Sequence, residues 1–305
     1  MEHDAAWRTK VIIAFAAVYV IWGSTYLAIR VGVQHLPPAL FAGFRFVLAG
    51  ILLALYARSR GQKFPTRFHE WRTIAITALF MLVGANGLVV WGEQWVPSNQ
   101  AALIVATTAL WLAGFGTLGS SGQKLGPRTV LGLAVGFFGV AMLMMPEQGF
   151  SLEHFGVQLA VLAACPLWAA GSMVAKRSQL TTPPLMVAAL QSLFAGLVFC
   201  GIGFPLGEAA RWSWSPQAIT SLAYLVVFGS CFAYAAYVWL LHEVSPAALG
   251  TYAYINPLVA VVLGWLVLQE TLSGKQLAGM VVILLGVMLV SISRPKALAA
   301  PSQRT

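Results

Sequence analysis

The chain has 305 residues, of which 59% are hydrophobic and 9% are charged, and its formal net charge is +9. Soluble domains carry roughly 25% charged residues, so a mean hydropathy of +0.80 excludes an ordinary soluble enzyme. The composition also excludes a disordered chain, a coiled coil and a disulfide scaffold. An excess of Lys and Arg suits nucleic acid in a soluble protein, but in an apolar chain basic loops set the orientation in a membrane. We therefore expect a lipid bilayer around the chain and no nucleic-acid partner.

The apolar runs are long enough to span a bilayer, which takes roughly 20 residues as a helix. The first run follows Arg8 and Lys10, as in a signal peptide, but no small-residue cleavage site follows it. We therefore predict a retained first helix. Pro, Gly, Ser or charged residues separate the runs and mark their ends. The ten predicted spans are 11–30, 38–57, 73–92, 98–118, 127–145, 156–175, 184–205, 217–241, 246–268 and 276–293.

Lys and Arg residues are distributed unevenly between the two sides of the predicted spans. With the N-terminus in the cytoplasm, fourteen of the eighteen lie on the cytoplasmic side. Three lie on the opposite side, namely Arg30, Arg211 and Lys275, and Arg45 lies within a span. Because basic loops stay in the cytoplasm, this bias predicts that both termini are cytoplasmic and that the number of spans is even.

The sequence repeats itself at an offset of 146 residues, which places Trp22 on Trp168 and the Pro-Pro pair 37–38 on the pair 183–184. Each repeat holds five predicted spans, an odd number, so the two copies enter the membrane from opposite sides. Two inverted halves enclose a site near the midplane and give alternating access in carriers.

We therefore predict an all-α polytopic membrane protein with ten transmembrane helices, arranged as a 5+5 inverted-topology repeat with both termini cytoplasmic. The first five-helix repeat occupies residues 1–146 and the second occupies residues 147–293. The polar residues 294–305 are expected to form a disordered cytoplasmic tail.

Glycines form a small-residue face on two of the predicted spans. Gly132, Gly136 and Gly139 share one face of the fifth span, and Gly279 and Gly286 match them in part on the tenth. Small residues let helix backbones approach closely in a membrane. This pattern predicts close helix packing, either within the chain or between the two copies of a homodimer.

Residues that bind metals or carry acid–base chemistry are missing from the middle of the spans. The three cysteines, Cys165, Cys200 and Cys231, lie inside apolar runs and have no metal-binding spacing. All nine acidic residues and all five histidines fall in predicted loops, tails or helix ends. The sequence therefore predicts no metal site, no cofactor and no catalytic residue, and it argues against an intramembrane enzyme.

Several motifs are similar to those of a known family of membrane carriers. They are Ile21–Tyr26 (IWGSTY), Gly92–Ser98 (GEQWVPS), Tyr252–Leu258 (YAYINPL) and Glu270–Ser273 (ETLS), together with Arg45. With these motifs the chain resembles the EamA-type branch of the drug/metabolite transporter superfamily over residues 11–293. The resemblance implies a ten-helix carrier in the bacterial inner membrane that exports amino acids, other metabolites or toxic compounds.

Two positions depart from the pattern of that family. The family has a proline in the fourth helix that matches Pro257 in the ninth, whereas this chain has the segment 107–111 (TTALW) there. Gln123 stands where the family has an acidic residue after the fourth helix, opposite Glu270 in the second repeat. Because of both differences, the gate formed by the first half is expected to differ in geometry from that of the family.

Polar side chains inside spans usually face the bundle or a wet cavity, because hydrocarbon does not solvate them. A hydroxyl often bonds its own helix backbone instead, and a Trp or Tyr near a span end is typical of the interfacial belt. The polar residues within the spans are Ser24, Thr25, Asn86, Thr107, Thr108, Ser172, Gln191, Ser192 and Asn256. From these and the aromatic residues near them, the predicted substrate-binding residues are Trp22, Ser24, Tyr26, Asn86, Trp168, Gln191, Tyr252, Tyr254 and Asn256.

Pro257, Arg45 and Glu93 are the predicted gating residues. Pro257 frees a backbone carbonyl that Asn256 can satisfy, so we expect a broken helix near the midplane, with a simple kink as the alternative. Arg45 lies roughly 12 Å into the second span, at about 1.5 Å per residue. It can bind a substrate carboxylate, but we favour a structural role, in which it pairs with Glu93 or with helix-end carbonyls or extends outward to the interface. Glu93 is also the candidate for proton coupling, and without such coupling we expect downhill transport.

Amides, hydroxyls and aromatic faces together suit a neutral or zwitterionic small molecule. We therefore predict a secondary transporter that exports small metabolites, amino acids above all, by alternating access. One alternative is a phosphorylated-sugar or nucleotide-sugar exchanger, which needs more than one buried cation to hold phosphate. The others are a toxic-compound efflux carrier and a membrane scaffold without transport.

Overall fold

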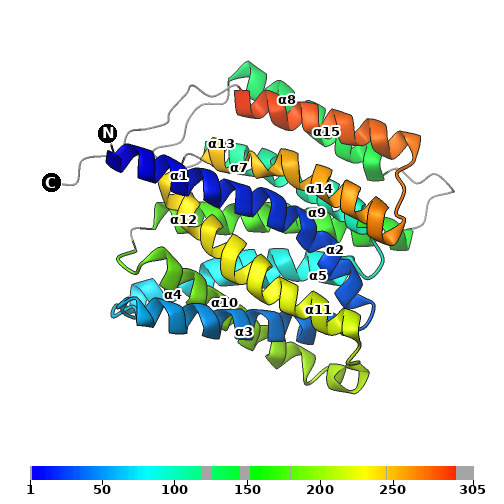
Figure 1. Ribbon diagram of the computed structural model, residues 1–305. Helices are drawn as coiled ribbons and strands as arrows, with labels where there is room; N and C mark the ends of the chain where they lie inside the picture. The colour runs from blue at the N-terminus through cyan, green and yellow to red at the C-terminus, as the bar shows by residue number, and fades with distance from the viewer. Residues whose placement is uncertain (1, 118–125, 145–151, 179, 245, 293–305) are drawn as a thin grey trace.

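The computed structural model describes residues 2–117, 126–144, 152–178, 180–244 and 246–292, and the regular elements in these ranges are all helical (Figure 1). The six helical stretches that are long and apolar enough to cross a membrane are Ala6–Val33, Pro38–Ser59, Phe68–Gly92, Phe155–Arg177, Pro184–Gly203 and Pro216–Glu243. Shorter apolar helices are Pro127–Met142, Ile255–Leu268 and Gly274–Leu289. The chain is thus a helical polytopic membrane protein. The predicted tail 294–305 and Gln123 lie outside the described residues.

The helices of the first half follow the predicted spans to within a few residues at most boundaries. They are α1 (Glu2–Ala16), η1 (Ala17–Ile21), α2 (Trp22–Val33), α3 (Pro38–Ser59), α4 (Phe68–Ala78), η2 (Leu79–Asn86), α5 (Gly87–Gly92), α6 (Ser98–Val105), α7 (Thr108–Phe115) and α8 (Pro127–Met144). Proline stands at the first position of α3 and of α8, because its fixed φ suits a helix start and its missing N–H has no partner to lose there.

The second half of the chain is also helical and contains a short 3-10 helix. Its described elements are α9 (Leu152–Arg177), α10 (Pro184–Gly203), η3 (Glu208–Arg211), α11 (Pro216–Tyr224), η4 (Leu225–Tyr234), α12 (Ala235–Glu243), α13 (Pro246–Leu249), α14 (Tyr252–Leu268) and α15 (Gly274–Ile292). The stretches η1, η2 and η4 are π-helical. No pattern in the sequence predicts the π-helical stretches or η3.

Helices α3 and α10 lie side by side with their backbones in close contact (Figure 1). A Cβ atom added at Gly196 would lie 2.5 Å from the backbone nitrogen of Val47, and one at Gly50 would lie 2.7 Å from that of Leu193. Real side chains do not tolerate such distances from backbone atoms, so glycine is required at both positions. Close backbone approach through small residues is the usual way to join helices in lipid, where apolar surface alone gives no preference.

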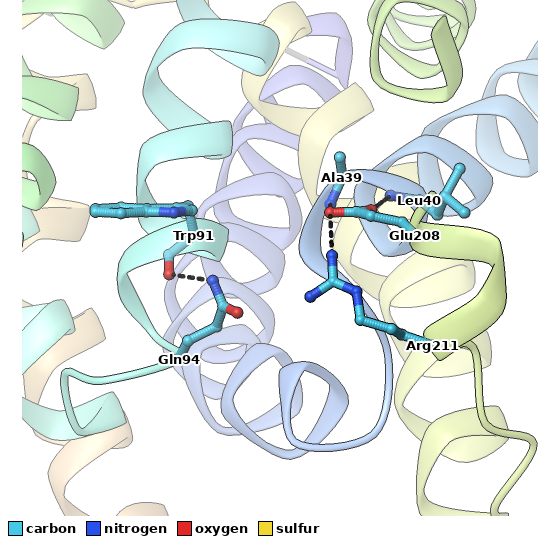
Figure 2. Close-up of polar contacts among 6 residues, drawn as sticks. All are labelled: Ala39, Leu40, Trp91, Gln94, Glu208 and Arg211. Carbon is cyan, nitrogen blue, oxygen red and sulfur yellow. Dashed lines mark hydrogen bonds and ion pairs between the residues drawn. The ribbon is translucent and has the colours of Figure 1, made fainter. Parts of the chain in front are cut away.

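A carboxylate caps the start of α3 (Figure 2). The backbone N–H of Leu40 donates to Oε2 of Glu208 at 2.8 Å, and that of Ala39 donates to Oε1 at 3.4 Å. Arg211 approaches the same carboxylate at 3.7 Å. The negative charge satisfies free N–H groups at the helix N-terminus and favours its dipole.

A second carboxylate binds the loop that leads into α10. Oε1 of Glu70 accepts from the backbone N–H of Thr181 at 2.6 Å and of Thr182 at 3.3 Å, just before the helix begins at Pro184. Glu70 follows α3 in the chain, while Glu208 follows α10, so each carboxylate binds at or just before the start of the other helix. The end of each helix therefore lies beside the start of its partner, and α3 and α10 are antiparallel.

Helices α8 and α15 form a second pair, at one side of the bundle (Figure 1). A Cβ atom added at Gly139 would lie 2.6 Å from the nitrogen of Ile283, and one at Gly286 would collide with the backbone of Gly136. Gly136 of α8 meets Gly286 of α15, whereas the later Gly139 meets the earlier Ile283, so this pair is antiparallel too. The prediction of close glycine packing is confirmed within the chain, and these faces are not free for a second copy.

The fourth predicted span is interrupted near its middle and the ninth near its start. Helix α6 ends at Val105 and α7 begins at Thr108, while α13 ends at Leu249 and α14 begins at Tyr252. At each interruption a threonine hydroxyl donates three residues back, Thr107 to the carbonyl of Ile104 at 2.8 Å and Thr251 to that of Ala248 at 2.6 Å. These local bonds replace helical ones and tighten the chain into a turn.

Candidate functional site

Seven of the predicted binding and gating residues line one internal cavity. The empty space in and in front of it, open solvent at the mouth included, is about 680 Å³. The predicted residues that line it are Trp22, Tyr26, Arg45, Asn86, Trp168, Tyr252 and Asn256. The lining residues absent from the predicted set include Thr25, Phe46, Thr108, Gly229 and Tyr234. The lining combines α2, α3, η2, α9, η4 and α14, so residues from both predicted halves contribute.

A cluster of aromatic rings forms one wall of the cavity. The Trp22 ring meets that of Trp168 edge-on at 5.4 Å between centroids, and it lies 4.9 Å from Tyr237 and 5.6 Å from Tyr252. The Trp22 Nε1–H donates to the carbonyl of Gly229 at 3.2 Å, and the Trp168 Nε1–H donates to the Tyr237 hydroxyl at 2.9 Å. With both indole N–H groups satisfied, the rings are held in place as rigid apolar faces.

Three polar atoms of lining residues are buried without a hydrogen-bond partner. They are Nη1 of Arg45, Oδ1 of Asn86 and Oγ1 of Thr108. Buried polar groups in folded proteins are nearly always paired with protein, water or ligand. The set offers a charged donor, an amide acceptor and a hydroxyl to a molecule in the cavity.

The predicted break at Asn256 and Pro257 is wrong, because α14 runs unbroken from Tyr252 to Leu268 with Pro257 inside it. The interruption lies further toward the N-terminus, at Gly250 and Thr251. The amide nitrogen of Asn256 donates to the backbone carbonyls of Tyr19 at 2.9 Å and of Tyr252 at 3.2 Å. Asn256 therefore joins α14 to the first helical segment and supports the cavity wall.

The predicted binding residue Ser24 lies away from the cavity lining. The Ser24 hydroxyl donates to the carbonyl of Ile21 at 2.7 Å and contacts the Tyr224 hydroxyl, which satisfies it within its own helix and against α11. Its neighbour Thr25 lines the cavity instead, because one residue along a helix turns the side chain by about 100°. Tyr254 belongs to α14, but its side chain lies outside the described part of the structure.

Gln191 does not line the cavity but contacts residues next to the lining. Its Nε2 donates to the Thr77 hydroxyl at 2.7 Å, and its Oε1 accepts from the Tyr234 hydroxyl at 2.7 Å. Since Tyr234 lines the cavity, Gln191 positions a lining residue. No pattern in the sequence distinguishes Tyr234 from the other aromatic residues of its span, which is why the prediction misses it.

Glu93 directly follows α5, and Nε2 of its neighbour Gln94 donates to the Trp91 carbonyl at 3.0 Å (Figure 2). Glu93 is 0% exposed, and neither carboxylate oxygen has a hydrogen-bond partner. An ion pair with Arg45, one of the structural roles that the sequence leaves open for Arg45, does not form among the described residues. The side chain of Arg30 donates instead to the backbone carbonyl of Glu93.

Replacing Glu93 by Gln is expected to raise thermal stability at alkaline pH. Burial, with a smaller effect of the Glu270 carboxylate, raises the pKa of Glu93 well above its usual range. The unfolded chain loses this proton above about pH 4.3, while the folded chain keeps it, so stability falls as pH rises through the interval between the two pKa values. The midpoint of thermal unfolding should therefore be a few degrees higher for Glu93→Gln than for wild type at pH 8, and the two should converge near about pH 4, below the unfolded pKa. Glu243→Gln, which changes an exposed acid, is the control. Parallel curves for Glu93→Gln and wild type would contradict the assignment.

Glu270 connects the second half to the first. Its Oε1 accepts from the backbone N–H of Ser98 at 2.9 Å, and its Oε2 accepts from the Ser98 hydroxyl at 2.7 Å and the Asn99 N–H at 3.1 Å. The carboxylate thus caps α6 from the end of α14. The motif at Glu270 that carries the family resemblance is therefore explained by a helix cap.

The sequence pattern of the EamA-like transporter family matches the chain twice, over residues 9–145 and 154–292. The chain belongs to this family. It is a membrane transporter of the drug/metabolite transporter superfamily and a multi-pass inner-membrane protein, and the family is one of transporters rather than enzymes.

The chain is similar to several curated proteins along most of its length. It is 37% identical to the "Uncharacterized inner membrane transporter YedA" of Escherichia coli (strain K12), over 92% of this chain and 90% of that protein. It is 28% identical to the "Uncharacterized transporter YvbV" of Bacillus subtilis (strain 168), over 93% of this chain and 92% of that protein. A protein of known crystal structure aligns with a TM-score of 0.69 at 20% identity, over 93% of this chain and 98% of that one, and so has the same fold.

Proposed function

We propose that this transporter exports small metabolites, with amino acids as the first substrate class, by alternating access to the cavity at Trp22, Asn86 and Asn256. The observation that carries the proposal is the cavity itself, which has rigid aromatic walls and an unpaired buried donor and acceptor. Such a lining suits a molecule with an apolar part and both donor and acceptor groups.

The proposed architecture is ten transmembrane helices in two inverted halves, 1–146 and 147–293. The antiparallel pairs support it, because α10 is the repeat equivalent of α3 and α15 that of α8. The π-helical stretch η2 begins at Leu79 and η4 begins at Leu225, again 146 residues apart. The double match to the family pattern has the same division. Trp22 and Trp168, which are repeat equivalents, meet edge-on, as expected near a pseudo-two-fold axis.

The orientation with both termini in the cytoplasm is part of the proposal. Helix α1 starts and α15 ends at the same end of the bundle (Figure 1), which is consistent with an even number of spans. The side with fourteen of the eighteen Lys and Arg residues is then cytoplasmic.

The experiment that tests the function is counterflow in proteoliposomes. Vesicles containing the purified chain are loaded with a mixture of unlabelled amino acids and diluted into each labelled amino acid, first at equal pH and then with a proton gradient. Exchange at equal pH supports a carrier that needs no gradient. Transport only with the gradient supports proton coupling and makes Glu93 the first residue to vary. No exchange in either condition would contradict the amino-acid substrate class.

A phosphorylated-sugar exchanger is the less favoured function. A phosphate dianion is normally held by more than one cationic side chain, whereas Arg45 is the single charged residue in the described lining. The aromatic wall also suits the apolar substrates of a toxic-compound efflux carrier, but such substrates provide no acceptor for the unpaired Arg45 guanidinium.

Asn256→Ala is expected to lower transport at least tenfold while the protein still folds. The change removes two hydrogen bonds to backbone carbonyls, of about 1 kcal/mol each, which loosens the contact between α14 and Tyr19 without opening a large void. Counterflow rate and thermal midpoint, compared with wild type, give the two readouts. Gln217→Ala, which removes an exposed amide on α11, is the matched control. Full transport by Asn256→Ala would exclude this side chain from the site.

A further inference from the structure

The Arg45 guanidinium faces the cavity with part of its hydrogen-bonding capacity unused. Its side chain is 4% exposed, its Nε donates to the Ser230 hydroxyl at 3.0 Å, and its Nη1 has no partner. In the described chain no carboxylate forms an ion pair with it. The Glu93 carboxylate acts on Arg45 electrostatically but makes no ion-pair contact with it. Burying a charge outside a direct ion pair is unfavourable, so a purely structural role accounts poorly for this position.

A glycine and an aromatic ring adjoin the Arg45 guanidinium in the cavity lining. A Cβ atom at Gly229 would lie 3.3 Å from its Nη2, so a larger residue there would crowd the group. The Phe46 ring lies 4.8 Å from its Cζ, and this aromatic face stabilises the cation without occupying its N–H groups. The remaining N–H donors are therefore available to an acceptor inside the cavity.

The charge of the lining limits the kind of acceptor. Arg45 is the one charged residue in the described lining, which matches a single negative charge. A guanidinium binds a carboxylate through two parallel hydrogen bonds. Oδ1 of Asn86, also buried and unpaired, accepts hydrogen bonds and so complements an ammonium group, which the aromatic faces of Trp22 and Tyr252 attract as well.

We propose that Arg45 binds the carboxylate of the transported solute while Asn86 accepts from its ammonium group, so that the cavity selects α-amino acids over their carboxamides. This inference rests on the proposed function, because it takes the cavity as the transport site. It assigns Arg45 a specificity-determining role in place of the structural role expected from the sequence.

Binding to the purified full-length protein tests the assignment independently of transport. The heat of binding is measured for the common amino acids, for 3-phenylpropionate, for glucose 6-phosphate and for the carboxamide of each amino acid that binds. We expect amino acids to bind at least tenfold more tightly than their carboxamides. Tighter binding of glucose 6-phosphate, equal binding of the carboxamides, or no binding by any carboxylate would overturn the proposal.

Three variants separate recognition from structure. Arg45→Gln should weaken amino-acid binding about 10- to 100-fold, as expected for loss of a charged hydrogen bond, while carboxamide binding changes little. Arg45→Lys should restore part of the affinity. Lys176→Gln is the matched control, because Lys176 is a half-buried cation whose Nζ donates to the carbonyls of Leu241 and Val244 at 2.8 and 2.9 Å, away from the cavity.

The thermal midpoint measured without ligand distinguishes a binding role of Arg45 from a structural one. If Arg45 serves the ligand, Arg45→Gln should unfold at the same or a higher temperature than wild type, because an unpaired buried charge is removed. A clear drop in midpoint with unchanged amino-acid affinity would overturn the proposal. Carboxylate binding without any counterflow would instead leave the assignment standing and refute the proposed transport function.

Discussion

Gly196→Val is expected to prevent the chain from reaching its folded state. A Cβ atom at Gly196 would lie 2.5 Å from the nitrogen of Val47 and 2.9 Å from the carbonyl oxygen of Gly43. Both are backbone atoms of α3, which cannot move without separating the two antiparallel helices. Overpacking of this kind typically costs 1–3 kcal/mol or more, and we expect more than about 3 kcal/mol here because no flexible side chain can yield. The yield of monodisperse protein and its thermal midpoint give the measurement.

Gly201→Val is the matched control for that experiment. Gly201 lies on the same helix, and nothing lies within 4 Å of the position its Cβ would take. It should express and unfold as wild type does. Equal yields for the two variants would show that α3 and α10 do not pack backbone to backbone.

Trp22→Ala is expected to reduce transport by about two orders of magnitude. Its ring contacts Trp168, Tyr237 and Tyr252, so its removal opens the aromatic wall and frees the carbonyl of Gly229. Loss of a buried Trp typically costs about 3–5 kcal/mol of stability, and a fall in transport from unfolding must therefore be separated from a fall in recognition.

Trp22→Phe makes that separation. It keeps an aromatic face and loses the Nε1–H donor, so we expect it to fold normally and to transport about fivefold more slowly than wild type, as one hydrogen bond is worth about 1 kcal/mol. Trp214→Ala, at a ring that is 70% exposed, should leave transport unchanged. Wild-type rates in a well-folded Trp22→Phe and in any recovered Trp22→Ala would remove this ring from the site.

The helix positions are predictable because the apolar runs are bounded by strong local signals. Proline marks the first residue of α3, α10 and α11, and the span length follows from the thickness of the bilayer. The interruption at Ala106–Thr107 has no such signal, since neither residue breaks a helix by itself. In the ninth span the prediction follows Pro257, whereas the chain turns at Gly250–Thr251. Proline in a membrane helix is tolerated where neighbouring groups satisfy the freed carbonyl.

The site is predictable in its residue types and less so in its exact members. Polar residues near the midplane point to Asn86 and Asn256, and the repeat points to Trp22 and Trp168. The rotation of each helix is not encoded in a local pattern, and this is why Ser24 is predicted where Thr25 lines the cavity. The unpaired state of Arg45 follows from tertiary packing alone, because the sequence places Glu93 as a plausible partner but does not give their separation.

Labelling of one cavity position from each side of the membrane tests the central claim most directly. The three native cysteines are replaced by alanine and Val105, a lining residue at the end of α6, is changed to Cys in proteoliposomes of known orientation. A small membrane-impermeant thiol reagent is then applied from outside or trapped inside. Alternating access predicts that the same cysteine reacts from both sides and that a transported amino acid changes both rates. Reaction from one side only, under every condition, would contradict a carrier whose cavity opens alternately to the two faces.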